Sequence, residues 1–224
     1  MPSEPLPGAK QHIETARAQA AQIDDLPADT PLKPIAQVGV LGAGTMGGGI
    51  AMNFLTAGIA VTIVEAEQAN LDKGVATIRR NYANSVKRGK MSEDEVERAM
   101  ALLTPSLAFD DLGGADLVIE AVYENMDLKK DIFAKLDRIA KPGAILASNT
   151  SYLNIDEMAA QTARPQAVLG MHFFSPANVM KLLEVVRGGK TGASELATVM
   201  DLAPQIGKIA VVSGVCPGFM ATAC

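Results

Sequence analysis

Short apolar runs and longer periodic segments alternate along most of the chain. The runs of strand length cover residues 38–41, 61–65, 116–121, 144–148, 168–174, 182–186 and 209–212. Most of them are continuously apolar rather than alternating, which is typical of strands that are buried on both faces of a parallel sheet. The pattern therefore predicts a mostly parallel sheet.

Segments with helical periodicity separate these runs, at residues 46–57, 69–87, 93–103, 128–139, 155–161 and 195–206. Ser92 and Glu95 have the spacing of a capping box, and Asn154 and Ser194 stand where helix N-caps belong. Strands that alternate with helices predict an α/β fold. We expect a Rossmann-type doubly wound, mostly parallel sheet with helices on both faces.

The first 34 residues differ in composition from the rest. They contain one short Ala- and Gln-rich segment of helical character at residues 10–23, followed by Pro27, Pro31 and Pro34. Such punctuation is typical of a linker. We therefore expect a linker or N-terminal extension over residues 1–34 and the folded domain over residues 35–216.

Composition narrows the class of protein. With 224 residues, 48% hydrophobic and 20% charged, the chain suits one globular domain and a tail. A net charge of -5 argues against nucleic acid as a partner. No apolar stretch reaches the roughly 20 residues of a membrane span, and the start lacks the apolar region of a signal peptide. Cys216 and Cys224 provide neither a disulfide framework nor a metal site, so a reducing cytoplasm is the expected compartment.

A glycine-rich sequence, GAGTMG at residues 42–47, lies between a predicted strand and a predicted helix. Gly42 permits a tight turn, Gly44 lets the backbone approach a pyrophosphate, and Gly47 lets the helix pack closely on the strand. The helix start at Thr45 and Met46 directs free N–H groups at the phosphates. This loop predicts a dinucleotide site.

An acidic residue follows the second predicted strand. Glu65 stands 23 residues after Gly42, where a carboxylate binds the ribose hydroxyls of the adenosine half. The same carboxylate would repel the 2′-phosphate of NADP by a few kcal/mol, and no Arg follows to offset this. The pattern favours NAD over NADP. The alternative is a structural glycine turn followed by a surface glutamate.

His172 and Glu184 each lie inside an apolar run. A carboxylate in a buried strand needs a partner, and a turn at residues 175–178 would fold the two runs back so that the pair meets. A histidine held by a carboxylate has a fixed tautomer and raised basicity, as a general base requires. The alternatives are a buried structural ion pair, or two residues that never meet.

Polar residues also follow two other strands. The sequence SNTS at residues 148–151 comes after an apolar strand, so Asn149 and Ser151 would lie at the edge where open parallel sheets bind ligands. Glu120 and Glu124 fall at and just after another strand end. A polar turn with a helix cap explains either group equally well.

Four ordered motifs, VGVLGAGTMGGGIA, LVIEAVYEN, ILASNTSYL and MHFFSPANVMKLLEVV, together resemble the NAD-binding domain of the L-3-hydroxyacyl-CoA dehydrogenases of β-oxidation. The resemblance covers roughly residues 35–219. It looks closest to the dehydrogenase part of the multifunctional fatty-acid oxidation proteins. In those, a Pro-rich connector like residues 26–34 joins an upstream enoyl-CoA hydratase domain.

The resemblance implies NAD-dependent oxidation of L-3-hydroxyacyl-CoA to 3-ketoacyl-CoA. It implies that His172 is the catalytic base, that Glu184 orients it, and that Ser151 and Asn149 contact the reacting oxygen and the nicotinamide end. The implied cofactor residues are Gly42, Gly44, Thr45, Met46, Gly47 and Glu65 for the adenosine and pyrophosphate half, with Glu124 and Lys129 nearer the nicotinamide ribose.

The sequence departs from the family at its end. Thr222 and Ala223 stand where the family has Asn-Arg, and residues 217–224 correspond to the start of a connection to a helical C-terminal domain that this sequence lacks. The implied partners are an acyl-CoA substrate and either a second copy or that missing domain. The alternative function is a non-catalytic NAD(H)-binding fragment, because a site at a domain interface loses orientation when one domain is missing.

A basic group of residues allows two interpretations. It lies on or just past the helix predicted at residues 69–87 and consists of Arg79, Arg80, Lys87, Arg88 and Lys90. A solvated helix face is the favoured interpretation. The other, implied by the family resemblance, is contact with the phosphates of CoA.

Overall fold

The computed structural model describes residues 8, 11, 12, 15, 23 and 25–216. In this part of the chain, eight strands form one sheet in the order β3-β2-β1-β4-β5-β6-β7-β8. The strands are β1 (Gln37–Leu41), β2 (Ala60–Val64), β3 (Leu103–Ser106), β4 (Leu117–Glu120), β5 (Ile145–Ser148), β6 (Val168–Phe173), β7 (Leu182–Arg187) and β8 (Ile209–Gly214). The α-helices are α2 (Thr45–Thr56), α3 (Gln68–Lys87), α4 (Glu93–Ala101), α5 (Met126–Ile139), α6 (Ile155–Ala159) and α7 (Ala193–Gln205).

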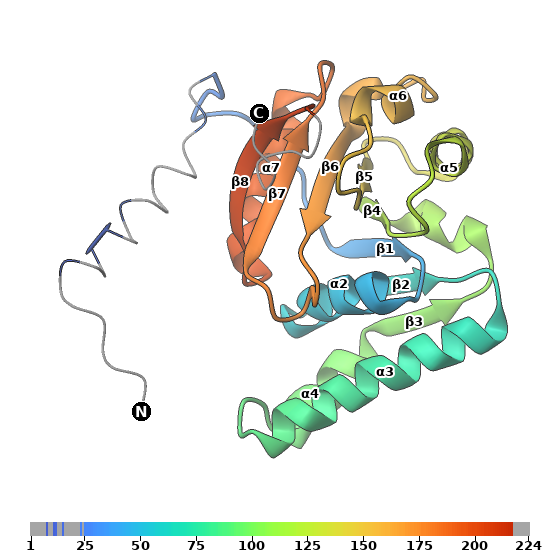
Figure 1. The fold of residues 1–224 in the computed structure, drawn as a ribbon, viewed down its shortest axis with the longest axis vertical. Helices are drawn as coiled ribbons and strands as arrows, with labels where there is room; N and C mark the ends of the chain where they lie inside the picture. The colour runs from blue at the N-terminus through green and yellow to red at the C-terminus, as the bar shows by residue number, and fades with distance from the viewer. Residues whose placement is uncertain (1–7, 9–10, 13–14, 16–22, 24, 217–224) are drawn as a thin grey trace.

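The sheet is doubly wound and mostly parallel, as predicted (Figure 1). Of the seven strand pairs, β6–β7 alone is antiparallel. The chain runs outward from β1 to β3 and then returns to β4 on the other side of β1. This reversal places the carboxyl ends of β1 and β4 at the switch point where open α/β sheets bind their ligands.

Two hydrophobic cores lie on the two faces of the sheet. Val40 and Ile119 point into the core formed with α2, α3, α4 and α7. Leu41 and Val118, their neighbours in sequence, point into the core formed with α5 and α6. Because both faces are covered, both sets of side chains are apolar, which explains why the strands are continuous apolar runs.

Two predictions about local structure were wrong. The sequence pattern did not predict β3, and its first residue was assigned to a helix over residues 93–103. β3 is an edge strand that pairs with β2 alone, and it contains Thr104 and Pro105, so it has no apolar run to reveal it. Ser194 is not an N-cap: Gly192 caps α7, and the Ser194 hydroxyl donates to Pro31 O (2.6 Å).

Other local predictions are confirmed. Ser92 and Glu95 form the capping box of α4, and the Asn154 side chain caps α6. Part of the expected linker packs on α7, because the Lys33 N–H donates to Thr198 Oγ1 (2.9 Å) and its ammonium pairs with Glu195.

The two ends of the chain are described only in part. The helix predicted at residues 10–23 lies mostly outside the described residues, as does the expected domain connection at residues 217–224. Cys216 is disulfide-bonded, although the sequence predicted no disulfide framework. Within the described residues, no helix has the length and apolarity needed to cross a membrane.

Candidate active site

The glycine loop forms the tight turn between β1 and α2. Gly42 has φ +103°, and its N–H donates to Val64 O (2.8 Å). A Cβ on Gly47 would lie 1.8 Å from Gly42 O, so a side chain there would prevent α2 from packing on β1. A Cβ on Gly44, by contrast, would meet nothing within 4 Å. The backbone at Gly44 is therefore open to a ligand, as a pyrophosphate site requires.

The first turn of α2 faces the same open space. Gly44 is the N-cap and provides no capping side chain, and the first turn contains no acidic residue. The N–H groups at Thr45 and Met46 thus belong to a helix N-terminus with a positive dipole end and no carboxylate to neutralise it. This end of α2 suits a phosphate group.

Glu65 lies beside the glycine loop. One oxygen of its carboxylate accepts a hydrogen bond from Ala43 N–H (3.0 Å) and the other from Ala66 N–H (2.8 Å). The side chain thereby connects the end of β2 with the loop after β1. Loop, helix end and carboxylate together have the arrangement that binds the adenosine half of NAD.

A cleft of about 340 Å³ extends from this loop between α3 and the turn that joins β6 to β7. Sequence reasoning missed the polar residues that line it on α3: Asn70, Lys73, Thr77 and Asn81. Their spacing of three or four residues places them on one face of the helix and would have identified them. The basic residues on or just past α3 that the sequence analysis singled out are exposed, as a solvated face predicts.

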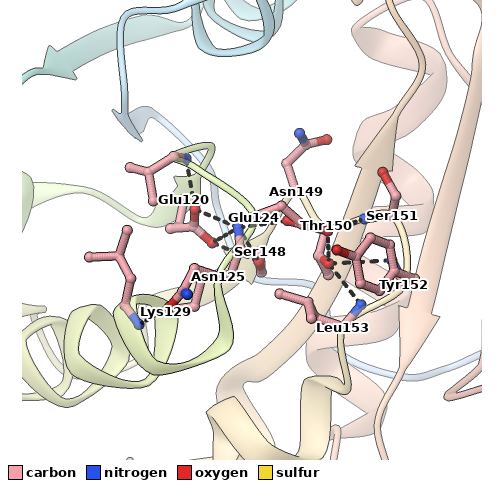
Figure 2. Close-up of polar contacts among 12 residues, drawn as sticks. Glu120, Glu124, Asn125, Lys129, Ser148, Asn149, Thr150, Ser151, Tyr152 and Leu153 are labelled. Carbon is pink, nitrogen blue, oxygen red and sulfur yellow. Dashed lines mark hydrogen bonds and ion pairs between the residues drawn. The ribbon is translucent and has the colours of Figure 1, made fainter.

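A buried charge network lies where β4 and β5 end (Figure 2). The Lys129 ammonium is 2.7 Å from both carboxylate oxygens of Glu120, and both side chains are completely buried. Ser148 donates its hydroxyl hydrogen to Glu120 (2.7 Å), and the Glu124 carboxylate lies 3.3 Å from the ammonium. One cation therefore holds two carboxylates.

Glu124 connects this network with the loop after β5. Its Oε1 accepts hydrogen bonds from the Thr150 hydroxyl and from Ser151 N–H (2.8 Å). The Lys129 ammonium has no exposed surface, and the carboxylates of Glu120 and Glu124 surround it. In this structure Lys129 therefore holds Glu124 in place at the edge of the sheet.

The loop after β5 is also attached to β6. The backbone N–H of Asn149 donates to Glu120 O (2.7 Å), and its side-chain oxygen accepts from Phe173 N–H (2.9 Å). Figure 2 shows the side chains of Asn149 and Ser151 pointing away from Lys129. Ser151 is exposed. The structure thus places Asn149 next to the strand of His172.

His172 and Glu184 meet across the antiparallel pair. They are directly opposed in the register of β6 and β7, and His172 Nδ1 lies 2.6 Å from Glu184 Oε2. Glu184 is completely buried, whereas 12% of the His172 side chain is exposed. A carboxylate at Nδ1 fixes the ring orientation and makes Nε2 the nitrogen that accepts a proton. The predicted meeting of these two residues is confirmed.

The fold and this site define a class. A doubly wound sheet with a glycine loop, an acidic residue after β2 and a His–Glu pair near the carboxyl ends of the strands is the arrangement of a dinucleotide-binding dehydrogenase domain. The family model described as "3-hydroxyacyl-CoA dehydrogenase, NAD binding domain" matches residues 37–216. The chain belongs to this family.

Curated relatives agree with this assignment. The chain is similar to the peroxisomal bifunctional enzyme of Cavia porcellus, with 45% identity over 188 residues, 84% of this chain and 26% of that protein. It is also similar to a probable 3-hydroxybutyryl-CoA dehydrogenase of Bacillus subtilis, with 43% identity over 83% of this chain and 65% of the relative. The chain thus spans about a quarter of the length of the bifunctional relative.

Solved structures show the same likeness. The M. tuberculosis protein FadB2 matches with a TM-score of 0.82 and 42% identity, over 84% of this chain and 67% of that one. The dehydrogenase part of multifunctional enzyme 1 from C. elegans matches with a TM-score of 0.80 and 30% identity, over 93% of this chain and 49% of that one.

Proposed function

We propose that this protein oxidises L-3-hydroxyacyl-CoA to 3-ketoacyl-CoA with NAD, and that His172 is the general base. The observation that carries the proposal is the His172–Glu184 pair, which lies on the sheet that also carries the glycine loop. The match to the family's NAD-binding domain supports the cofactor, and the names of the relatives support the substrate class.

The proton transfer follows from the geometry of the pair. Nδ1 of His172 donates to Glu184, so Nε2 takes the proton of the C3 hydroxyl as the C–H bond at C3 breaks. When bound, NAD accepts the hydride. The buried Glu184 carboxylate then stabilises the imidazolium, which returns the proton when a 3-ketoacyl-CoA is reduced. Ser151 and Asn149, on the neighbouring loop, would orient the reacting oxygen and the nicotinamide end.

The cleft beside α3 supports an acyl-CoA as the substrate. Lys73 provides a cation, and Thr77 and Asn81 provide hydrogen-bonding groups along one wall. These groups suit the phosphates and amides of CoA. We therefore expect CoA contacts on the cleft face of α3. The exposed basic residues nearby are the other candidates for contact with the CoA phosphates.

A second candidate is an NAD(H)-binding unit without turnover of its own. It is favoured by the length of the bifunctional relative, of which this chain matches 26%. A second copy of the chain, or a helical domain supplied separately, would then complete the acyl pocket. We retain the cytoplasm as the proposed compartment, although several relatives are peroxisomal enzymes.

NADH oxidation with acetoacetyl-CoA separates the two candidates. We expect turnover by the 224-residue chain and a loss of about 10²- to 10⁴-fold in His172→Ala, the usual contribution of a general base. His12→Ala is the matched control, because His12 is the other of the two histidines. NADH fluorescence reports cofactor binding in the same samples. NADH binding without turnover would support the second candidate instead.

A further inference from the structure

Lys208 is a buried lysine between α7 and β8. Its side chain and backbone together are 6% exposed. The ammonium donates to Ala177 O (2.5 Å) and to Met180 O (2.8 Å). Both carbonyl groups belong to the turn over residues 174–181, which joins β6 to β7. A single cation thus holds this turn at two points.

Asn53 of α2 holds the same turn from another side. Its side-chain amide donates to Ala177 O (3.2 Å) and to Gly49 O (3.1 Å). A Cβ on Gly49 would lie 3.1 Å from the Cβ of Ala177, so α2 packs directly on the turn. Ala177 O therefore accepts from both Asn53 and Lys208, and the turn is fixed to the helix that begins at the glycine loop.

The turn connects two parts of the candidate site. Pro176 and Asn178 line the cleft opposite Lys73 on α3. The strands on either side of the turn carry His172 and Glu184. The Lys208 ammonium also lies 5.8 Å from the centre of the Phe173 ring, the residue after His172. A displacement of the turn would therefore move a wall of the cleft.

A lysine at this position loses solvation of its ammonium when the chain folds. Burial lowers its pKa to about 8, which shows that the folded state disfavours the ammonium. A methionine would fill a similar volume without that desolvation cost. The advantage of the lysine lies in the two carbonyl groups that it orients.

We propose that Lys208 is a positioning residue, which holds the β6–β7 turn against α2 and so sets the acyl-CoA side of the cleft. The proposal rests on the proposed function for the identity of the ligand. It predicts that Lys208 affects the acyl-CoA substrate more than NADH. Gly44, Thr45 and Glu65 line the same cleft, but the glycine turn and the hydrogen bonds of Glu65 to Ala43 and Ala66 hold them without Lys208.

Lys208→Met tests the proposal, with Lys190→Met as a control for an exposed lysine. Leu202→Ala is the second control. It removes a buried side chain of α7, so it opens a cavity in the core and lowers stability while both Lys208 hydrogen bonds remain. Steady-state kinetics with acetoacetyl-CoA should show a KM increase of about 10-fold or more in Lys208→Met, the equivalent of one to two lost hydrogen bonds. The affinity for NADH should change less than about 2-fold by comparison.

A second readout does not depend on turnover. The chain has two histidines, so imidazole NMR signals of ¹⁵N-histidine-labelled protein can be assigned with His172→Ala. We expect Lys208→Met to shift the His172 signals and Leu202→Ala to leave them in place. Asn53→Ala, which removes the other donor to Ala177 O, should act in the same direction and replaces Lys208→Met if that variant does not fold.

The outcomes separate the two proposals. An unchanged KM and unchanged His172 signals in Lys208→Met would overturn the positioning role, as would equal effects in Leu202→Ala. If the unmodified chain binds NADH but does not turn over, the proposed function fails. The NMR comparison then decides the role of Lys208 alone, and an unshifted His172 signal again overturns it.

Discussion

The side-chain oxygen of Asn149 accepts a hydrogen bond from the backbone N–H of Phe173 over 2.9 Å. The backbone register of β5 and β6 ends at Ser148 and Gly170, so this side chain extends the pairing beyond the end of β5. It attaches the loop that carries Ser151 to the strand that carries His172. Two groups that are far apart in sequence are thereby held at one edge of the sheet.

Asn149→Ala should separate these groups. The variant loses one side-chain hydrogen bond and should be destabilised by about 1 kcal/mol. Asn154→Ala is the matched control, because it also removes an Asn oxygen that accepts one hydrogen bond from a backbone N–H, at the cap of α6. Urea unfolding should show similar losses of stability in the two variants. Turnover of acetoacetyl-CoA should fall about 10-fold or more in Asn149→Ala alone. Equal activity in the two variants would contradict the role of Asn149.

Glu65→Ser should relax the preference for NADH over NADPH. The carboxylate that would repel a 2′-phosphate disappears, so the ratio of the two dissociation constants should shift by about 10- to 100-fold. Fluorescence titration of both cofactors measures it. Glu67→Ser is the control, because Glu67 stands at the N-cap of α3 without a capping hydrogen bond from its side chain. The same shift in both variants would mean that overall charge, rather than Glu65, sets the preference.

Lys129→Met should destabilise the fold by about 3–5 kcal/mol, because it leaves the buried Glu120 carboxylate without its cation. Lys130→Met, one residue further along α5, breaks an exposed pair with Glu157 and should cost about 1 kcal/mol or less. Denaturant unfolding of the two variants measures the difference. Adding Glu120→Gln to Lys129→Met should restore part of the stability. A loss in Lys129→Met no larger than in Lys130→Met would show that Glu120 is not held as a carboxylate.

Lys208 should make stability depend on pH in the alkaline range. Burial lowers its pKa to about 8 in the folded chain, against 10.5 for an ordinary lysine. Below pH 8 both states carry the proton, so the lysine adds no pH dependence. Between pH 8 and 10.5 the unfolded chain binds more protons, so the free energy of unfolding rises with pH.

The measurement is urea unfolding of the unmodified chain and of Lys208→Met from pH 7 to 10. As pH rises above 8, the free energy of unfolding of the unmodified chain should increase relative to that of Lys208→Met. Tyr82, whose pKa is raised chiefly by burial, is present in both proteins and cancels. A difference that is constant over this range would show that Lys208 titrates normally in the fold.

Local sequence patterns predicted most of the fold. The apolar strands and the capping residues of α4 and α6 follow from neighbouring positions in the chain, and so does the glycine loop. β3 was missed because an edge strand pairs on one side and needs no apolar run. Ser194 was misassigned because a serine near a helix start is an equally good donor to another segment, here Pro31.

The sequence by itself also showed the features that the chemistry requires. They are a glycine loop, an acidic residue after the second strand, and a histidine and a glutamate in apolar runs. Lys208 directly precedes the apolar run at residues 209–212, so its position alone did not mark it as a residue needing partners. Only the tertiary structure decided which residues these side chains contact. The antiparallel register of β6 and β7 sets His172 opposite Glu184, the network at Glu120 buries Lys129, and the β6–β7 turn meets α2 and Lys208. Such contacts join residues distant in sequence, and their distances depend on how the sheet and helices pack, which no local pattern specifies.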